Sequence, residues 1–244
     1  MGVSAEQLLL ICLIMTGAGA VQGAVGFGSG LLAVGLMSPI LGVRQASIAF
    51  CLPALIMCVS MLLRLREHFR WRRVAPVAIG LLAGVPMGVW FLVRAQPRIL
   101  EVCLGILMVL TVAYNLAPRL ARRRWHPYYV GIPCGLLSGA LSGAFSTGGP
   151  PLVAYLSTQQ FDRMRFAATL QVFFVTNATL RLVELTRRGL LTAETVRLGL
   201  VGAAALVGGS FLGMFLLKRL SDRLFRRIVL GMLVLLAVWY LLPH

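Results

Sequence analysis

The chain has 244 residues, of which 59% are hydrophobic and 12% are charged, and its mean hydropathy is +0.89. This composition excludes an ordinary soluble domain, in which about a quarter of the residues are charged, and it predicts an all-α polytopic membrane protein. The net charge of +16 does not indicate a nucleic-acid partner, because the arginines lie in short stretches between apolar segments. Membrane proteins mark their cytoplasmic loops in this way.

Eight apolar segments are predicted in chain order, each long enough to cross a hydrocarbon core about 30 Å thick. We expect all of them to be helical, because a segment inside lipid must satisfy its own backbone hydrogen bonds. They cover residues 7–37, 45–63, 74–93, 99–117, 128–158, 166–186, 195–217 and 226–242. No basic stretch precedes the first segment, so we expect it to be retained and not cleaved as a signal peptide.

Two glycine-rich stretches interrupt the first and fifth segments, about 120 residues apart. They are residues 23–32 (GAVGFGSGLL) and 143–152 (GAFSTGGPPL). Interrupted segments at matching places in two halves indicate the binding site of a transporter. The alternative is that small residues at these positions let neighbouring helices pack closely.

Three further matches follow in the same order in both halves of the chain. LGILMVL at 104–110 matches LGMLVLL at 230–236, AGVPMG at 83–88 matches GGSFLG at 208–213, and RQAS at 44–47 matches RFAA at 165–168. The chain is therefore predicted to hold two four-segment repeats, residues 1–117 and 128–244. A basic linker, residues 118–127, separates them.

The first segment of each repeat has 31 residues and would be about 46 Å long as a straight helix at ~1.5 Å per residue. Either it crosses the membrane at a steep tilt, or it breaks at the glycines and returns as a hairpin. Single crossings divide the loop arginines and lysine 12 to 10 between the two faces, whereas hairpins divide them 16 to 6. The second division fits the positive-inside rule. It predicts inverted repeats, with both termini outside the cytoplasm.

Helices that start at Ser29/Gly30 and at Pro150/Pro151 would direct free N–H groups into the protein interior. Such helix starts attract anions, and proline is well suited to the first helical turn. The hydroxyl groups of Ser29, Ser146 and Thr147 would add donors beside these amides. Small oxyanions are the ligands that fit such a pocket.

Arg181 adds a positive charge within the sixth segment, where an arginine costs at least ~2.5 kcal/mol at the bilayer centre. It would face the anion, extend to the membrane interface, or pair with Glu184. Asn177 lies one helical turn before it and shares its face, and Gln22 and Ser142 directly precede the two stretches. The predicted substrate-binding residues are Gly26, Phe27, Gly28, Ser29, Gly30, Ser146, Thr147, Gly148, Gly149, Pro150, Asn177 and Arg181.

We expect no enzyme, no cofactor and no metal site. The stretch at 26–30 has no following Lys-Ser/Thr pair, so it is not a phosphate-binding loop. Ser29 has no histidine within a segment to act as its base. The five cysteines lie in apolar segments without metal-binding spacing, so we expect neither disulfides nor metal binding: Cys12, Cys51, Cys58, Cys103 and Cys134.

The duplicated plan, GFGSGLL at 26–32 and GGPPL at 148–152 resemble the sulfite exporter TauE/SafE family of bacterial permeases. Asn177 and Arg181 match the family's polar-then-basic pair in the sixth segment, where lysine is commoner. Ser29 replaces a frequent glycine, and Val34-Gly35 stands where Val-Pro is usual.

The resemblance implies export of sulfur-containing anions such as sulfite or organosulfonates. A passive anion channel, or a permease for an unrelated small organic anion, remains an alternative. The expected partners are a small anion and the lipid bilayer, and the oligomeric state is left open, with a homodimer as one option.

Overall fold

The computed structural model describes residues 4–66, 75–116, 127–159, 161–217 and 222–242, and every regular element in these ranges is a helix. The helices are α1 (Ala5–Val25), α2 (Ser29–Leu41), α3 (Val43–Leu65), α4 (Ala75–Arg94), α5 (Pro97–Leu116), α6 (Pro127–Phe145), α7 (Gly149–Ser157), α8 (Arg163–Arg187), α9 (Ala193–Leu217) and α10 (Asp222–Leu241). The predicted linker lies outside the described residues except for Pro127, which begins α6.

Both long segments are interrupted at the predicted glycines. The first break separates α1 from α2, and Gly26 and Gly28 adopt φ values of 89° and 103° there, a region that L side chains disfavour. The second break separates α6 from α7, and Ser146 has a φ of 57°. The prediction of two interrupted helices is confirmed.

Six helices in the described part of the chain are long and apolar enough to cross a membrane: Ala5–Val25, Val43–Leu65, Ala75–Arg94, Pro97–Leu116, Met164–Arg187 and Ala193–Phe215. The described parts of α6 and α10 and the whole of α2 are shorter apolar helices. Large apolar side chains remain exposed along the outer faces, as a lipid environment allows; Leu82 on α4 and Leu235 on α10 are 58% and 72% exposed. The chain is a multi-pass membrane protein.

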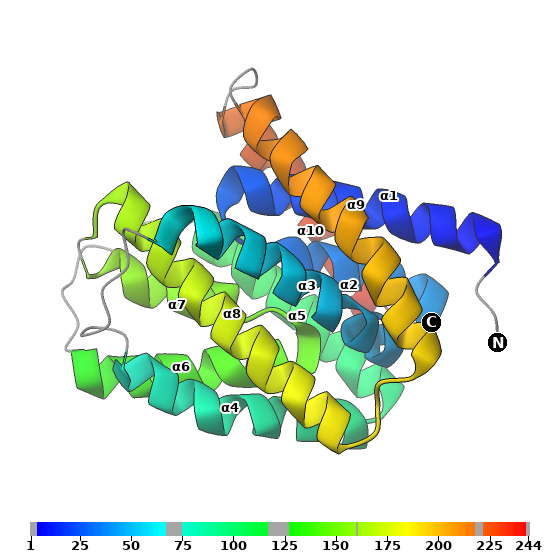
Figure 1. Ribbon diagram of the computed structural model, residues 1–244, viewed down its shortest axis with the longest axis horizontal. Coiled ribbons are helices and arrows are strands. Elements are labelled where there is room, and N and C mark those ends of the chain that lie inside the picture. The colour runs from blue at the N-terminus through cyan, green and yellow to red at the C-terminus, as the bar shows by residue number, and fades with distance from the viewer. Residues whose placement is uncertain (1–3, 67–74, 117–126, 160, 218–221, 243–244) are drawn as a thin grey trace.

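Two helix pairs pack with unusually close backbones, α1 with α9 and α4 with α6 (Figure 1). A Cβ atom added to Gly23 would lie 2.0 Å from the carbonyl oxygen of Ser210, and one on Gly143 would lie 2.4 Å from that of Val85. Only glycine fits at such contacts, which are common between membrane helices. The packing explanation is therefore correct for the glycines that begin the two stretches.

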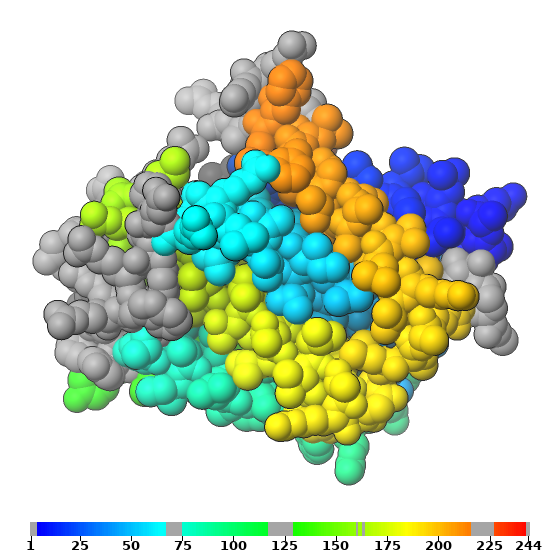
Figure 2. Space-filling view, viewed as in Figure 1, coloured from blue at the N-terminus to red at the C-terminus, as the bar shows by residue number. Residues whose placement is uncertain are grey.

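Helices α3 and α8 lie over the middle of the bundle in this view, with α9 and α4 on either side (Figure 1). In the space-filling view these four helices form one continuous surface (Figure 2). The second break is buried at Thr147 and Gly148, whereas the first break, residues 26–28, is partly exposed.

Candidate functional site

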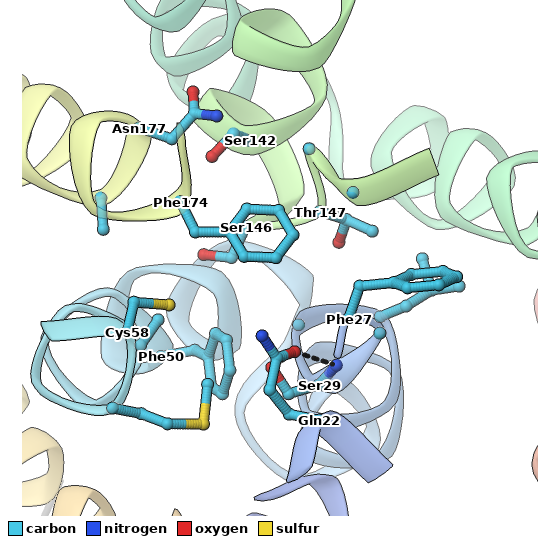
Figure 3. Close-up of a pocket in the computed structure, with 18 of the residues that line it drawn as sticks. Gln22, Phe27, Ser29, Phe50, Cys58, Ser142, Ser146, Thr147, Phe174 and Asn177 are labelled. Carbon is cyan, nitrogen blue, oxygen red and sulfur yellow. Dashed lines mark hydrogen bonds between the residues drawn. The ribbon is translucent and has the colours of Figure 1, made fainter. Parts of the chain in front are cut away.

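A cavity of about 60 Å³ lies where the two breaks meet α3, α5 and α8 (Figure 3). It is several times larger than the ~10–15 Å³ that one water molecule requires. Eleven of the twelve predicted substrate-binding residues line it: Phe27, Gly28, Ser29, Gly30, Ser146, Thr147, Gly148, Gly149, Pro150, Asn177 and Arg181. Gln22 and Ser142 also line it, whereas Gly26 does not.

The two breaks touch each other directly at this cavity. A Cβ atom on Gly30 would lie 2.1 Å from the carbonyl oxygen of Ser146, so the start of α2 rests on the backbone of the second break. The first break likewise contacts the start of α7, because a Cβ atom added to Gly149 would lie 3.3 Å from the ring of Phe27. Residues about 120 positions apart in the sequence thus build one site.

The start of α2 offers backbone donors to the cavity. Gln22 Oε1 accepts from both the amide and the hydroxyl of Ser29, at 3.3 and 2.9 Å (Figure 3). The amides of Gly30 and Leu31 have no acceptor among the described residues. Two buried N–H groups at a helix start are suited to an anion.

The start of α7 offers fewer donors than the sequence predicts. The helix begins at Gly149, so Pro150 and Pro151 occupy its second and third positions. Proline has no N–H group, and only Gly149 and Leu152 retain one among the first four residues. The prolines fix the direction of the helix without adding donors.

Arg181 is 1% exposed and is held by three oxygen atoms. Its Nε donates to the carbonyl of Gly143 at 3.0 Å, its Nη2 to Ser47 Oγ at 2.6 Å, and its Nη1 to Ser146 Oγ. The side chain does not extend to the membrane interface. It does not pair with Glu184 either, because that carboxylate accepts from Arg188 at 2.6 Å.

No carboxylate neutralises Arg181 within the described residues, where the ion pairs are Arg98–Glu101, Arg165–Asp162 and Arg188–Glu184. A buried charge without a counter-ion costs several kcal/mol. An anion in the adjoining cavity would offset that cost.

Asn177 is 2% exposed, and neither its Oδ1 nor its Nδ2 has a hydrogen-bond partner among the described residues. Buried amide groups are almost always paired, so a ligand or a water molecule belongs at this position. Asn177 lies beside Ser142 at the edge of the cavity (Figure 3).

The sequence did not identify Ser47 on α3, although it binds Arg181 and also donates to the carbonyl of Ala144 at 2.7 Å. The signal in the sequence is a serine within an apolar segment, and the structure shows that this serine is fully buried. Further lining residues that the sequence did not identify are Leu31, Phe50, Cys51, Ala54, Met57, Cys58, Thr111, Phe174 and Ala178.

The family model described as sulfite exporter TauE/SafE matches residues 11–240. The chain belongs to this family. A curated relative from Cupriavidus necator, named probable sulfite/organosulfonate exporter TauE, is 27% identical over 231 residues, which cover 91% of this chain and 89% of the relative. No solved structure matches the chain.

The family match confirms the resemblance that the glycine motifs indicated. TauE/SafE proteins are membrane exporters, so the chain is a transport protein and not an enzyme.

Proposed function

We propose that this protein exports small sulfur-containing oxyanions, namely sulfite or organosulfonates, from the cytoplasm across a bacterial inner membrane. The observation that carries the proposal is Arg181, a buried cation in the cavity lining that pairs with no carboxylate among the described residues. Gly30 and Leu31, whose backbone amides are free, and Asn177, whose side-chain amide is unpaired, line the same cavity. The Cupriavidus necator relative is named for sulfite and organosulfonates.

We further propose that residues 1–117 and 128–244 are inverted repeats that hold the substrate between them, as in many carriers. If each of α1–α5 corresponds in order to one of α6–α10, the helix contacts of the two halves match. The contact of α1 with α9 corresponds to that of α6 with α4, and the contact of α3 with α9 corresponds to that of α8 with α4. Figure 1 supports the inversion, because α1 begins at the right-hand edge of the molecule and α6 at the left-hand edge.

The directions of equivalent helices support the inversion as well. On α3 and α8, Ser47 contacts Arg181 while Cys51 contacts Ala178, so the two helices run antiparallel.

On α5 and α10, Arg98 donates to the carbonyl of Leu242 at 2.7 Å, and Met108 and Leu236 meet at Gly35. This pair is also antiparallel. Repeats of the same orientation would make both pairs parallel.

The inverted arrangement places the 16 basic loop residues on one face, which we assign to the cytoplasm. Both termini then lie in the periplasm. A site between two inverted repeats suits alternating access, which favours a carrier over a passive channel.

The proposal is tested with purified protein in vesicles loaded with unlabelled sulfite. We expect uptake of external radiolabelled sulfite by counterflow, which a carrier shows and a channel does not. Arg181→Met keeps the length of the side chain but removes its charge and its donors. Loss of hydrogen bonds to a charged ligand, about 1.5–3 kcal/mol, should lower the apparent affinity roughly 10- to 150-fold.

The matched control is Arg188→Met on the same helix, because Arg188 is exposed and bonds only to Glu184 and its own helix end. It should transport like the wild type. Sulfite uptake in Arg181→Met equal to that of the control, with both variants monodisperse, would remove Arg181 from the site and overturn the proposal.

A further inference from the structure

We infer that the cavity accepts oxyanions only as monoanions, prefers one that still carries a proton on oxygen, such as hydrogensulfite, and rejects dianions. The inference rests on the proposed function, since it specifies the charge and protonation state of the oxyanion that this site takes. Two independent features of the cavity lead to it, its charge and its hydrogen-bonding groups.

The charge of the cavity matches one negative charge. Arg181 is the one cationic side chain in the lining, and no carboxylate or histidine accompanies it there. Helix starts add only fractional positive charge. The remaining walls are largely apolar, with Phe50, Phe174 and Met57 among them. A dianion would carry a second charge into this space without a full counter-charge, and unpaired buried charge is costly.

Most hydroxyl protons at the cavity are already used within the protein. Ser29 donates to Gln22, Thr111 to the carbonyl of Leu107, and Thr147 to the carbonyl of Phe145. Neither Ser142 nor Ser146 donates to an acceptor among the described residues, and the Oγ of Ser146 accepts from Arg181, which leaves the Ser146 proton unused. That proton is free to bind an oxyanion.

Asn177 supplies the second feature. Its amide presents one donor group and one acceptor group, and both are unpartnered in the described structure. This holds whichever way the amide is turned. A fully deprotonated oxyanion has acceptors only, so it would bind the NH₂ group and leave the buried Oδ1 unpaired. A monoprotonated oxyanion binds both, because its O–H donates to Oδ1 while its other oxygens accept from Asn177 and Ser146.

The consequence for transport is that each sulfite leaves the cell as hydrogensulfite. Each transport event therefore carries one proton and a net charge of minus one out of the cell. No carboxylate of the protein is needed to carry that proton, which fits a lining without acidic residues.

The test is calorimetric binding of sodium sulfite to the purified full chain between pH 6 and pH 8.5. The second ionisation of sulfurous acid lies near neutral pH. If only the monoanion binds, the apparent affinity follows its fraction and falls about tenfold per pH unit above that ionisation. Sodium methanesulfonate, a monoanion throughout, should bind with constant but weaker affinity, because it has no proton for Oδ1. Sodium sulfate, a dianion throughout, should not bind.

Methanesulfonate also controls for titration of the protein. The ionisable side chains at the cavity are Arg181 on α8 and the thiols of Cys51 and Cys58 on α3; the lining residues of the other elements do not titrate. A pH effect that arises in these groups would change methanesulfonate binding too.

A matched pair of variants tests the role of Asn177. Asn177→Leu keeps the volume of the side chain but removes both polar groups. At pH 6 this variant should therefore bind hydrogensulfite no more tightly than methanesulfonate. Thr176→Val is the control, because Thr176 does not line the cavity and its hydroxyl donates to its own helix at Val172. It should keep that preference.

Sulfite affinity that stays constant or rises with pH, or sulfate that binds as well as methanesulfonate, would overturn the monoanion inference and leave sulfur-oxyanion export standing. Absence of binding by sulfite and methanesulfonate at every pH would overturn the proposed function together with the inference.

Discussion

Arg181 donates hydrogen bonds to three oxygen atoms that belong to different parts of the fold: the end of α6, the second break, and α3. Ser47 is central to this arrangement because its Oγ accepts a hydrogen bond from Arg181 and its hydroxyl donates one to the carbonyl of Ala144. The side chain of Ser47 is fully buried, so both bonds lie in the protein interior. Arg181 therefore joins the candidate site to the packing of three elements.

Ser47→Ala should lower the stability of the protein. It leaves one N–H of Arg181 and the carbonyl of Ala144 unpaired in the interior, which costs about 1–3 kcal/mol. Thermal unfolding of the purified protein, followed by circular dichroism, measures this as a lower midpoint temperature. Ser60→Ala on the same helix is the control, because Ser60 bonds only to Met57 within its own helix. Equal midpoints for the two variants would show that the Ser47 bonds do not stabilise the fold.

The two interrupted helices are the elements on which the site depends, and their breaks contact each other. Gly30 is the closest point, with the carbonyl of Ser146 in the place where a Cβ atom would lie. Separation of the breaks would move the free amides of α2 away from Arg181 and open the cavity.

Gly30→Ala should therefore reduce sulfite counterflow strongly, because backbone atoms at 2.1 Å cannot yield as a flexible side chain can. Gly17→Ala in α1 is the control, since no atom beyond the adjacent residues and backbone of its own helix lies within 4 Å of the added methyl group. Alanine in a helix interior is favoured over glycine by roughly 0.5–1 kcal/mol, so this variant should keep its activity and unfold at the same or a higher temperature. Wild-type counterflow in Gly30→Ala would show that close contact of the breaks is not required.

The sequence predicts where the helices break more reliably than what each glycine does. Gly28 takes a positive φ, whereas Gly23 sits in an ordinary helix and lets α9 approach. Both roles require the absence of a Cβ atom, so the same residue type serves for both, and only the three-dimensional neighbours distinguish them.

The polar partners in the site show the same limit. Arg181 and Asn177 were predicted because polar groups in an apolar segment are costly. The contact of Arg181 with Ser47 joins positions 134 residues apart, and it follows from the antiparallel packing of α3 on α8. Nothing in the local sequence of α3 encodes that register.

At the scale of the whole molecule, the two proposed halves exchange their packing partners. The backbone of α1 rests on α9 of the second half, and that of α6 rests on α4 of the first half. Neither half would bury its own glycine-lined helix faces alone. The division into repeats at 1–117 and 128–244 remains a prediction. It states that the two halves are related to each other and does not state that either half is a separate domain.

The inverted arrangement makes a prediction that separates it from eight single crossings. It places Ser4 before α1, Gln96 between α4 and α5, and Ala193 at the start of α9 on the same, periplasmic face. Single crossings would place Gln96 opposite the other two. The three positions are exposed, so each can carry a single cysteine after the five native cysteines are replaced by alanine.

We expect a membrane-impermeant maleimide to label Ser4→Cys, Gln96→Cys and Ala193→Cys in intact cells, to the extent reached after the cells are opened. Arg64→Cys is the opposite control, because the arrangement places this end of α3 at the cytoplasmic face; it should be labelled only after opening. The cytoplasmic assignment rests on the distribution of arginines and lysine between the loops, and labelling tests it independently of that distribution. Labelling of Gln96→Cys and Ala193→Cys from opposite sides would contradict inverted repeats, and labelling of all three periplasmic positions only after opening would reverse the direction of the whole protein in the membrane.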